Sequence, residues 1–303
     1  MRKTRILASL SIAAIAAIAL TACNSGTPGD TGNAGDNGDS GSSTPWTVAT
    51  DVSLTGSPTF DRIQKAGKVT IGVKEDQPGL GYLDATTNER SGFDVDIARW
   101  MAASLGYGED KIDFKPIASQ NREQSIVNGD IDFYVGTYSI TDKRKELISF
   151  AGPYFITGQG LLVAKDNTSI TGKDSLTSSD VVCSATGSTS IQQIKDLTKA
   201  QTKEYDTYSK CVQALIQGQV DAVTTDEAIL LGYAAQDPDH LKTVGDVFTE
   251  ERYGIGLAKG DTALQTFFND TLTDGHDVWQ KIFDNNLGKS GVTAEQPKVD
   301  PVG

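Results

Sequence analysis

The sequence predicts an α/β protein whose body consists of two similar lobes, each a mostly parallel sheet flanked by helices. Short apolar runs alternate with segments of helical periodicity along the whole body, which is typical of α/β layers. A helix, a glycine stop and a buried strand occur twice, at residues 128–135 and again at 217–223. Two such lobes in one chain place a ligand cleft between the carboxyl ends of their strands.

The first series of helices and strands is predicted from the spacing of apolar residues and from the residues that begin or end helices. Gly67 and Gly129 end two helices, and Asp94 is expected to be the N-cap of a third. The predicted helices are 60–66, 94–106 and 122–128, and the predicted strands are 69–73, 112–117, 131–136 and 160–164.

The second series repeats this alternation. The predicted strands are 181–183, 204–208, 222–224 and 253–258, the predicted helices are 189–199, 211–216 and 227–235, and an apolar segment lies at 241–244. Residues 263–285 are expected to be helical with a break near Asp274 and Gly275.

A cluster of cations follows the strand 131–136. If a helix starts at Thr141, then Lys143, Arg144 and Lys145 lie in or next to its first turn. Cations are disfavoured there because the unpaired N–H groups already make a helix N-terminus positive. The pattern therefore indicates an anionic partner for at least one of them.

The N-terminus has the pattern of a targeting segment. A basic stretch, 1–5, precedes the uncharged apolar stretch 6–20, which is too short to span a membrane comfortably. Residues 20–23 resemble a bacterial lipobox, so we expect a signal peptide at 1–22 and acylation of Cys23, which would anchor the protein to the membrane. A plain secretory signal with an incidental cysteine is the alternative.

The segments that flank the body are polar. Residues 23–57 are predicted to be a flexible tether, since almost all of 24–45 is Gly, Ser, Thr, Asn, Asp or Pro. Residues 290–303 are predicted to be a frayed polar tail. The formal net charge of −13 argues against nucleic acid as a partner.

The chain has three cysteines. With Cys23 assigned to lipid, Cys183 and Cys211 remain, and an exported protein is expected to oxidise two such thiols to a disulfide. Two separate buried thiols are the alternative.

Six short blocks carry a family resemblance. They are 92–98, 119–122, 140–145, 150–154, 187–189 and 221–226. In this order and spacing they resemble the extracellular solute-binding proteins of polar amino acid ABC importers, and most closely the actinobacterial glutamate-binding lipoproteins. The resemblance implies a type II periplasmic-binding fold with a two-strand hinge. It places the first lobe at 58–156 and 254–289, and the second at 157–253.

The resemblance also implies how an α-amino acid is held. Arg144 matches the arginine that pairs with the α-carboxylate, and Asp226 matches the partner of the ammonium. Further ligand contacts are expected from two turns and one strand end, at Gly136, Thr137, Ser139, Thr186, Ser188, Thr189 and Thr225. Asp226 could instead serve only as a helix cap.

The side chain of the ligand is implied by a second set of residues. In relatives selective for acidic amino acids an arginine and a basic residue reach the distal carboxylate; here these are Arg122, next to Ser119, and Lys74. Lys74 could instead be a solvated lysine, and Arg122 a surface charge. Glu75 departs from the family, because many glutamate binders carry an aromatic residue there.

These expectations converge on one function. The predicted protein is a monomeric, lipid-anchored receptor on the outer face of a bacterial membrane, which binds L-glutamate or L-aspartate by hinge closure and delivers it to an ABC permease. A glutamine- or asparagine-binding receptor, or a sensor for a membrane kinase, is the alternative. No cofactor, metal or catalysis is expected: the two histidines, His240 and His276, lack metal-like spacing, and no phosphate-binding motif occurs.

Overall fold

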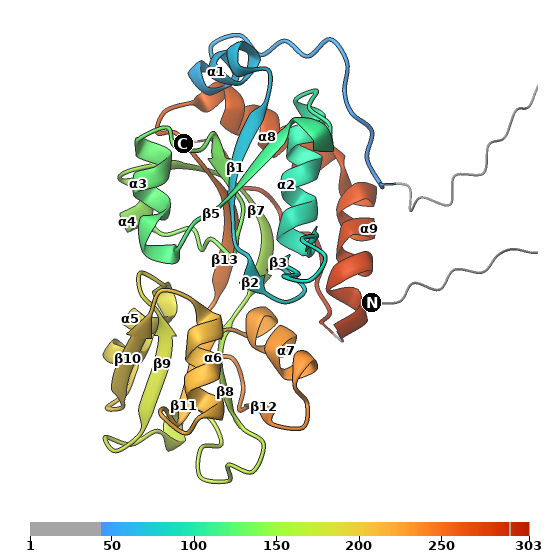
Figure 1. The fold of residues 1–303 in the computed structure, drawn as a ribbon. Helices are drawn as coiled ribbons and strands as arrows, with labels where there is room; N and C mark the ends of the chain where they lie inside the picture. The colour runs from blue at the N-terminus through green and yellow to red at the C-terminus, as the bar shows by residue number, and fades with distance from the viewer. Residues whose placement is uncertain (1–43, 291, 303) are drawn as a thin grey trace, which may run out of the picture. The chain divides into compact units, whose positions relative to one another are not determined.

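The computed structural model describes residues 44–290 and 292–302. The predicted signal segment, Cys23 and the first part of the predicted tether lie outside the described residues. Two five-stranded sheets with their own helices form the two lobes of the body (Figure 1). The two-lobed α/β fold predicted from the sequence is confirmed. Within the described residues, no helix has the length and apolar character needed to cross a membrane.

The first lobe is built on the sheet β5-β1-β6-β13-β7. Its strands are β1 (Val69–Val73), β5 (Ile112–Pro116), β6 (Phe133–Tyr134), β7 (Ser149–Thr157) and β13 (Glu251–Leu257). Its helices are α1 (Pro58–Ala66), α2 (Phe93–Ser104), α3 (Arg122–Val127), α4 (Asp142–Lys145), α8 (Thr262–Asp274) and α9 (His276–Asn286). A small hairpin sheet belongs to the same lobe and consists of β2 (Asp76–Gln77), β3 (Gly81–Leu83) and β4 (Arg90–Ser91).

The second lobe is built on the sheet β10-β9-β11-β8-β12. Its strands are β8 (Gln159–Ala164), β9 (Val181–Ala185), β10 (Gln201–Tyr205), β11 (Ala222–Asp226) and β12 (Leu241–Val244). Its helices are α5 (Thr189–Leu197), α6 (Tyr208–Ile216) and α7 (Glu227–Gln236). The predicted strand 204–208 is displaced to 201–205, because Thr207 caps the helix that begins at Tyr208.

Both sheets are mixed rather than mostly parallel. β1 runs parallel to β5 and β6, whereas β13 runs antiparallel to β6 and β7. In the second sheet β9 runs parallel to β10 and β11, and β8 runs antiparallel to β11 and β12. The antiparallel strands include those by which the chain passes between the lobes, since β7 continues into β8 through Gly158 without a crossover helix.

An aromatic cluster joins the helices of the first lobe to its sheet. The rings of Trp279 and Phe283 in α9 stack at 5.3 Å, and both meet Phe93 of α2 edge-on. The indole of Trp279 donates a 2.7 Å hydrogen bond to the carbonyl of Tyr154 in β7, so that its one polar group is satisfied inside the core.

The predicted tether and tail are both partly folded, which corrects the sequence analysis. Trp46, Val52 and Leu54 pack against the main core. In the tail, Val292, Ala294 and Val299 do the same. The few apolar residues in these polar segments are spaced so that they reach the body, and burying them offsets the loss of chain entropy.

Asp300 fixes the tail to the strands of the first lobe. Its carboxylate accepts a 2.6 Å hydrogen bond from Arg252 in β13, and its N–H donates to the carbonyl of Gly152 in β7 at 2.7 Å. The side chain of Asn269 in α8 donates to the carbonyl of Asp300 at 3.0 Å.

Asp94 is not the N-cap of α2. The helix begins at Phe93 with Gly92 as its cap, at a φ of 120°. A Cβ at Gly92 would lie 2.1 Å from the carbonyl oxygen of Leu80, so only glycine fits. Asp94 therefore lies inside the helix, where its buried carboxylate accepts hydrogen bonds from the N–H of Thr137 at 2.9 Å and the phenol of Tyr154 at 2.8 Å.

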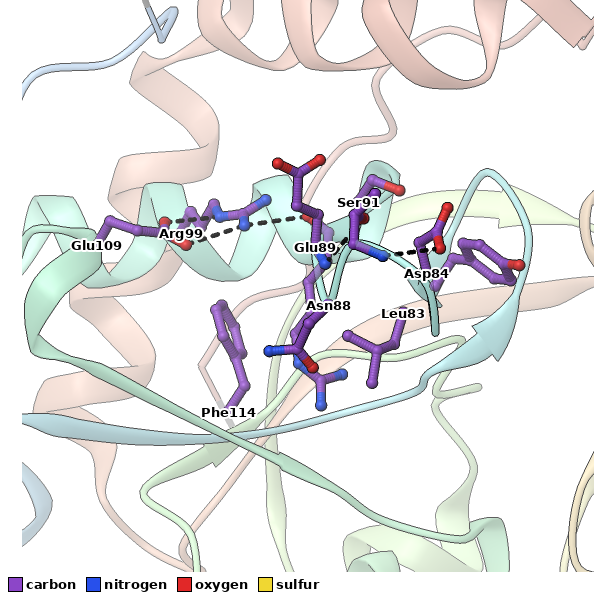
Figure 2. A pocket seen from close by; sticks show the side chains of 11 residues that line it. Leu83, Asp84, Asn88, Glu89, Ser91, Arg99, Glu109 and Phe114 are labelled. Carbon is purple, nitrogen blue, oxygen red and sulfur yellow. Dashed lines mark hydrogen bonds and ion pairs between the residues drawn. The ribbon is translucent and has the colours of Figure 1, made fainter. Parts of the chain in front are cut away.

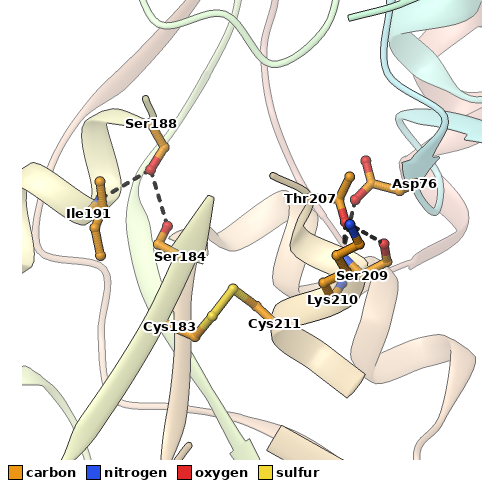
Figure 3. Close-up of a disulfide and its surroundings, with 9 residues drawn as sticks. All are labelled: Asp76, Cys183, Ser184, Ser188, Ile191, Thr207, Ser209, Lys210 and Cys211. Carbon is orange, nitrogen blue, oxygen red and sulfur yellow. Dashed lines mark hydrogen bonds between the residues drawn. A yellow bond between two sulfur atoms is a disulfide. The ribbon is translucent and has the colours of Figure 1, made fainter. Parts of the chain in front are cut away.

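Cys183 and Cys211 form the predicted disulfide, which joins β9 to α6 (Figure 3). Their Cα atoms are 5.5 Å apart, and both residues are fully buried. We call residues 186–189, between β9 and the first turn of α5, the α5 turn. The disulfide therefore links the strand that leads to the α5 turn with the helix that begins at Tyr208.

Candidate functional site

The two lobes contact each other at one end of their sheets. A groove of about 710 Å³ is lined by residues of both lobes, among them Arg144 of α4 and Ser188 and Thr189 of the α5 turn. Gly187 lies against Gln120, since a Cβ on Gly187 would be 2.6 Å from the Cα of Gln120. Buried charged side chains gather at this contact.

Arg144 is the one cation of the 143–145 run that turns inward. Its Nη1 donates to the carbonyl of Ser139 at 2.7 Å, its Nε to Glu123 at 3.0 Å and its Nη2 to the carbonyl of Gly187 at 3.2 Å. Thr141 caps α4 as expected, by accepting from the N–H of Arg144. Lys143 and Lys145 are exposed, and of the three cations only Arg144 is hydrogen-bonded to the second lobe among the described residues.

Arg122 is also buried, which excludes the surface alternative. Its guanidinium donates to the carbonyls of Ser119 at 3.0 Å, Thr137 at 3.3 Å and Gly187 at 3.4 Å, and it lies over the ring of Tyr138 at 4.3 Å. Within the described residues it makes no ion pair with a carboxylate. Its acceptors are all main-chain oxygens, so its charge is only partly compensated.

Lys74 is 5% exposed, which excludes the solvated alternative. Its Nζ donates a 2.7 Å hydrogen bond to the hydroxyl of Ser119. Burial, followed by the nearby Arg122 guanidinium, lowers the pKa of Lys74 to about 7. Glu75, the residue that departs from the family, pairs with Arg90 at 3.4 Å instead of with Lys74.

The turn after β6 carries three of the predicted contacts. Thr137 has a φ of 46°, and its hydroxyl donates to the amide oxygen of Gln77 at 3.2 Å. Ser139 is buried and gives its carbonyl to Arg144. At Gly136 a Cβ would lie 3.2 Å from the Cγ of Lys74 and 2.8 Å from the phenol oxygen of Tyr134, so glycine leaves room for the lysine chain.

In the second lobe, Ser188 starts α5. Its hydroxyl accepts from the N–H of Ile191 at 3.1 Å and lies 3.2 Å from the hydroxyl of Ser184 (Figure 3). Thr189 donates to Glu251 at 3.0 Å, and the N–H of Thr186 donates to the carbonyl of Tyr205. The Ser188 and Thr189 hydroxyls therefore already have partners within the protein.

Asp226 ends β11 and is buried. Its Oδ2 accepts a 2.6 Å hydrogen bond from the phenol of Tyr253. Its side chain makes no capping bond to α7, although it stands at the N-cap position. Burial, and then the charge of Glu251, raises the pKa of Asp226 to about 7. The hydroxyl of the neighbouring Thr225 is buried and has no hydrogen-bond partner among the described residues.

Two residues of the site were missed by the sequence analysis. Gln77 is fully buried beside Thr137, and its Nε2 has no partner among the described residues. Tyr208 is buried at the start of α6, where burial and the Asp226 charge raise its pKa to about 12. The one signal in the sequence was their position: Gln77 and Tyr208 each lie at or within a few residues of the carboxyl end of a predicted strand.

Another hollow lies on the first lobe, beside the β3–β4 hairpin (Figure 2). Its volume is about 690 Å³, and Arg99 and Phe114 line it. The guanidinium of Arg99 is already paired with Glu109 at 2.7 Å and with Asp96 at 3.1 Å. In the part of the chain that the structure describes, no group of acids, histidines or cysteines has the arrangement of a metal site. The contact between the lobes is the candidate site: Arg144, Ser188 and Thr189 line the groove there, whereas Lys74, Arg122 and Asp226 are buried and do not line it.

The comparisons with known proteins agree with this geometry. A model of the bacterial extracellular solute-binding proteins, family 3, matches residues 69–289. The chain belongs to this family. The solute-binding protein is 42% identical over 244 residues to glutamate-binding protein GluB of Corynebacterium efficiens, which covers 76% of this chain and 82% of the relative.

A glutamine-binding protein of Geobacillus stearothermophilus is 40% identical over 205 residues, which covers 67% of this chain and 78% of the relative. Among solved structures, an ancestral arginine-binding protein bound to arginine is similar with a TM-score of 0.68 and 33% identity, over 73% of this chain and 99% of that one. The solute-binding protein thus shares the type II periplasmic-binding fold, and the amino acids named for its relatives differ.

Proposed function

We propose that this solute-binding protein captures L-glutamate between its lobes, with L-aspartate as a second ligand, and delivers it to the membrane permease of an ABC importer. The observation that carries the proposal is the set of three buried cations at the interlobe contact, Lys74, Arg122 and Arg144. Only Arg144 has a carboxylate partner, Glu123, among the described residues. A ligand with two carboxylates would compensate such a site.

The amino acid backbone is assigned to groups from both lobes. Arg144 would pair with the α-carboxylate through its outer N–H groups, of which Nη2 here donates to the carbonyl of Gly187 and Nη1 to that of Ser139. Thr137 and Ser139, with the main chain at Gly136, and the α5 turn at Thr186, Ser188 and Thr189 would supply further contacts. Asp226, beside Thr225, would hold the ammonium, since a buried carboxylate needs a cation.

The distal carboxylate is assigned to Arg122 and Lys74, with Ser119 between them. Ser119 touches both cations, because its hydroxyl accepts from Lys74 and its carbonyl from Arg122. A neutral amide in this place would leave buried charge uncompensated, at a cost of several kcal/mol. This difference favours glutamate over glutamine.

Other ligands and readouts give distinct results. The likeness to a glutamine-binding protein makes glutamine the rival ligand. A sensor would bind the same amino acid and signal to a membrane kinase. Transport assays in cells that lack the permease separate the two roles, because import stops there and signalling does not. We infer that the protein binds without turnover, which chromatography of the recovered ligand checks.

Calorimetry with glutamate, aspartate, glutamine and asparagine tests the assignment. We expect glutamate to bind at least tenfold more tightly than glutamine, a difference of about 1.4 kcal/mol. Arg144→Ala should abolish binding of all four, whereas Arg122→Ala should weaken the acidic ligands most. Lys145→Ala is the control, since this lysine is exposed and does not line the groove, and it should bind as the wild type does. Tighter binding of glutamine than glutamate would contradict the side-chain assignment.

The membrane anchor is a separate proposal, argued from the sequence around Cys23. We infer acylation of this cysteine, because it follows the apolar segment at the position where a lipobox is cleaved. Expressed in a bacterial host, the wild type should enter the detergent phase and carry a lipid-modified N-terminal peptide by mass spectrometry. Cys23→Ala should stay in the aqueous phase; equal partition of the two would contradict the anchor.

A further inference from the structure

Lys74 is enclosed by its own lobe. The carbon chain of the lysine passes between two glycines, since a Cβ at Gly81 would be 2.8 Å from the Cβ of Lys74 and one at Gly136 would be 3.2 Å from its Cγ. Ser119, its hydrogen-bond partner, also belongs to the first lobe. The burial of Lys74 therefore comes largely from elements of the first lobe.

The charges around Lys74 are mostly of its own sign. Arg122 and Arg144 disfavour its ammonium form, and Asp76 is the carboxylate that favours it. The Oδ2 of Asp76 accepts a hydrogen bond from the N–H of Ser209 at 3.0 Å. Lys74 makes no ion pair within the described residues. The other titratable groups of the site include Glu123, Asp94 and Asp226 and the phenols of Tyr134, Tyr138 and Tyr208.

Three other carboxylates of the site each have a hydrogen-bond partner of their own. Glu123 accepts from Arg144, Asp94 from Thr137 and Tyr154, and Asp226 from Tyr253. A buried amine in such surroundings loses its proton at a lower pH than an exposed lysine unless an anion reaches it.

We propose that the side-chain carboxylate of a bound acidic amino acid holds Lys74 as an ammonium, so that glutamate binding takes up one proton from solvent and the choice between glutamate and glutamine depends on pH. This inference rests on the proposed function. Glutamine brings no anion to Lys74, and its amide oxygen can accept a hydrogen bond from the neutral amine. Lys74 thus sets ligand specificity through its protonation.

The sign of the pH dependence follows from the two states of Lys74. Below a pH of about 7 the lysine is already charged in the free protein, so glutamate affinity is constant. Above that pH the free protein must gain a proton to bind, and glutamate affinity falls by up to about tenfold per pH unit. Glutamine affinity has no such decrease, so the preference for glutamate is greatest in mildly acidic surroundings.

Proton uptake can be measured by titration calorimetry in phosphate and in imidazole, whose ionisation enthalpies differ. At about pH 8, where most of the free Lys74 is neutral, glutamate should take up close to one proton more than glutamine. At about pH 6 the difference should be close to zero. Because both ligands bring the same ammonium to Asp226, comparing them cancels any proton released there.

Two variants make the assignment to Lys74 specific. Lys74→Arg carries its charge at every pH used, so its proton uptake should be the same for glutamate and glutamine. Lys115→Met removes an exposed lysine of β5 and should keep the wild-type difference. Tight glutamate binding with equal proton uptake for both ligands would overturn the inference and leave the proposed function standing. Tighter binding of glutamine at both pH values would overturn the proposed function itself.

Discussion

The phenol of Tyr233 in α7 donates a hydrogen bond to the main-chain carbonyl of Asp76 in β2, and this bond joins the two lobes directly. The carboxylate of Asp76 accepts a second interlobe bond, from the N–H of Ser209 at 3.0 Å (Figure 3). We call Asp76, Ser209 and Tyr233 the interlobe latch. None of the three was assigned a ligand contact, so the latch stabilises closure from outside the proposed site.

Tyr233→Phe should weaken ligand binding without destabilising the fold. The variant keeps the ring and removes a partly buried hydrogen bond between the lobes, which is worth about 1 kcal/mol and corresponds to roughly fivefold in affinity. The loss should come from faster ligand release in stopped-flow measurements, because the bond forms only when the lobes meet. Tyr205→Phe is the control, since the Tyr205 hydroxyl makes no hydrogen bond among the described residues. Equal affinities of the wild type and Tyr233→Phe would argue against the latch.

Gly187→Ala should hinder closure sterically. The new Cβ would lie 2.6 Å from the Cα of Gln120 in the opposite lobe, so the two lobes could not approach as they do here. We expect ligand affinity to fall more than tenfold by calorimetry. Gly218→Ala is a matched control, because its φ of 67° is close to the 78° of Gly187 while no atom lies within 4 Å of its Cβ position. Both should lose about 1 kcal/mol of stability, and only Gly187→Ala should lose affinity.

The sequence predicted the local elements well where burial and periodicity coincide. Strand β1 matches the predicted residues, and the break between α8 and α9 occurs at Gly275 as expected. Strand β7 was missed, because Gly152 and Pro153 in its centre interrupt the strand pattern. The antiparallel course of β13 was missed because it depends on how the chain returns between lobes.

For the candidate site, the sequence predicted the buried charged residues but not the contacts that depend on the tertiary fold. The family blocks located Arg144, Arg122 and Asp226, whose burial the structure shows, while their ligand roles stay predictions. Local sequence could not show that Glu75 pairs with Arg90, because that contact depends on the hairpin that brings residue 90 beside β1. Gln77 was missed for the same reason: its environment is created by Thr137, sixty residues away in the chain.

Removing the disulfide should destabilise the second lobe. Cys183 and Cys211 are 28 residues apart, and closing a loop of that size stabilises a fold by roughly 3–4 kcal/mol in the chain-entropy model. A Cys183→Ala, Cys211→Ala double variant should unfold at lower denaturant concentration, with an unfolding free energy lower by about that amount. The oxidised wild type in the same buffer is the reference, and an unchanged unfolding midpoint would show that the bond contributes little.

The buried Asp226 should make the ligand-free protein less stable as pH rises. Burial raises the pKa of Asp226 to about 7 in the folded protein, against about 3.9 for an unperturbed aspartate. Between these values the folded state holds a proton that the unfolded state has lost, so stability falls with rising pH by about 4 kcal/mol and is constant above about pH 7. Asp226→Asn cannot ionise and should lose this slope. The gain in its unfolding free energy over the wild type should therefore grow from pH 5 to pH 8 in urea titrations. Tyr253→Phe, which deprives the ionised carboxylate of its 2.6 Å hydrogen bond, should raise the pKa of Asp226 further and extend the decline in stability to higher pH. Parallel stability curves for the wild type and Asp226→Asn would mean that Asp226 is ionised throughout this range and needs no ligand ammonium to compensate it.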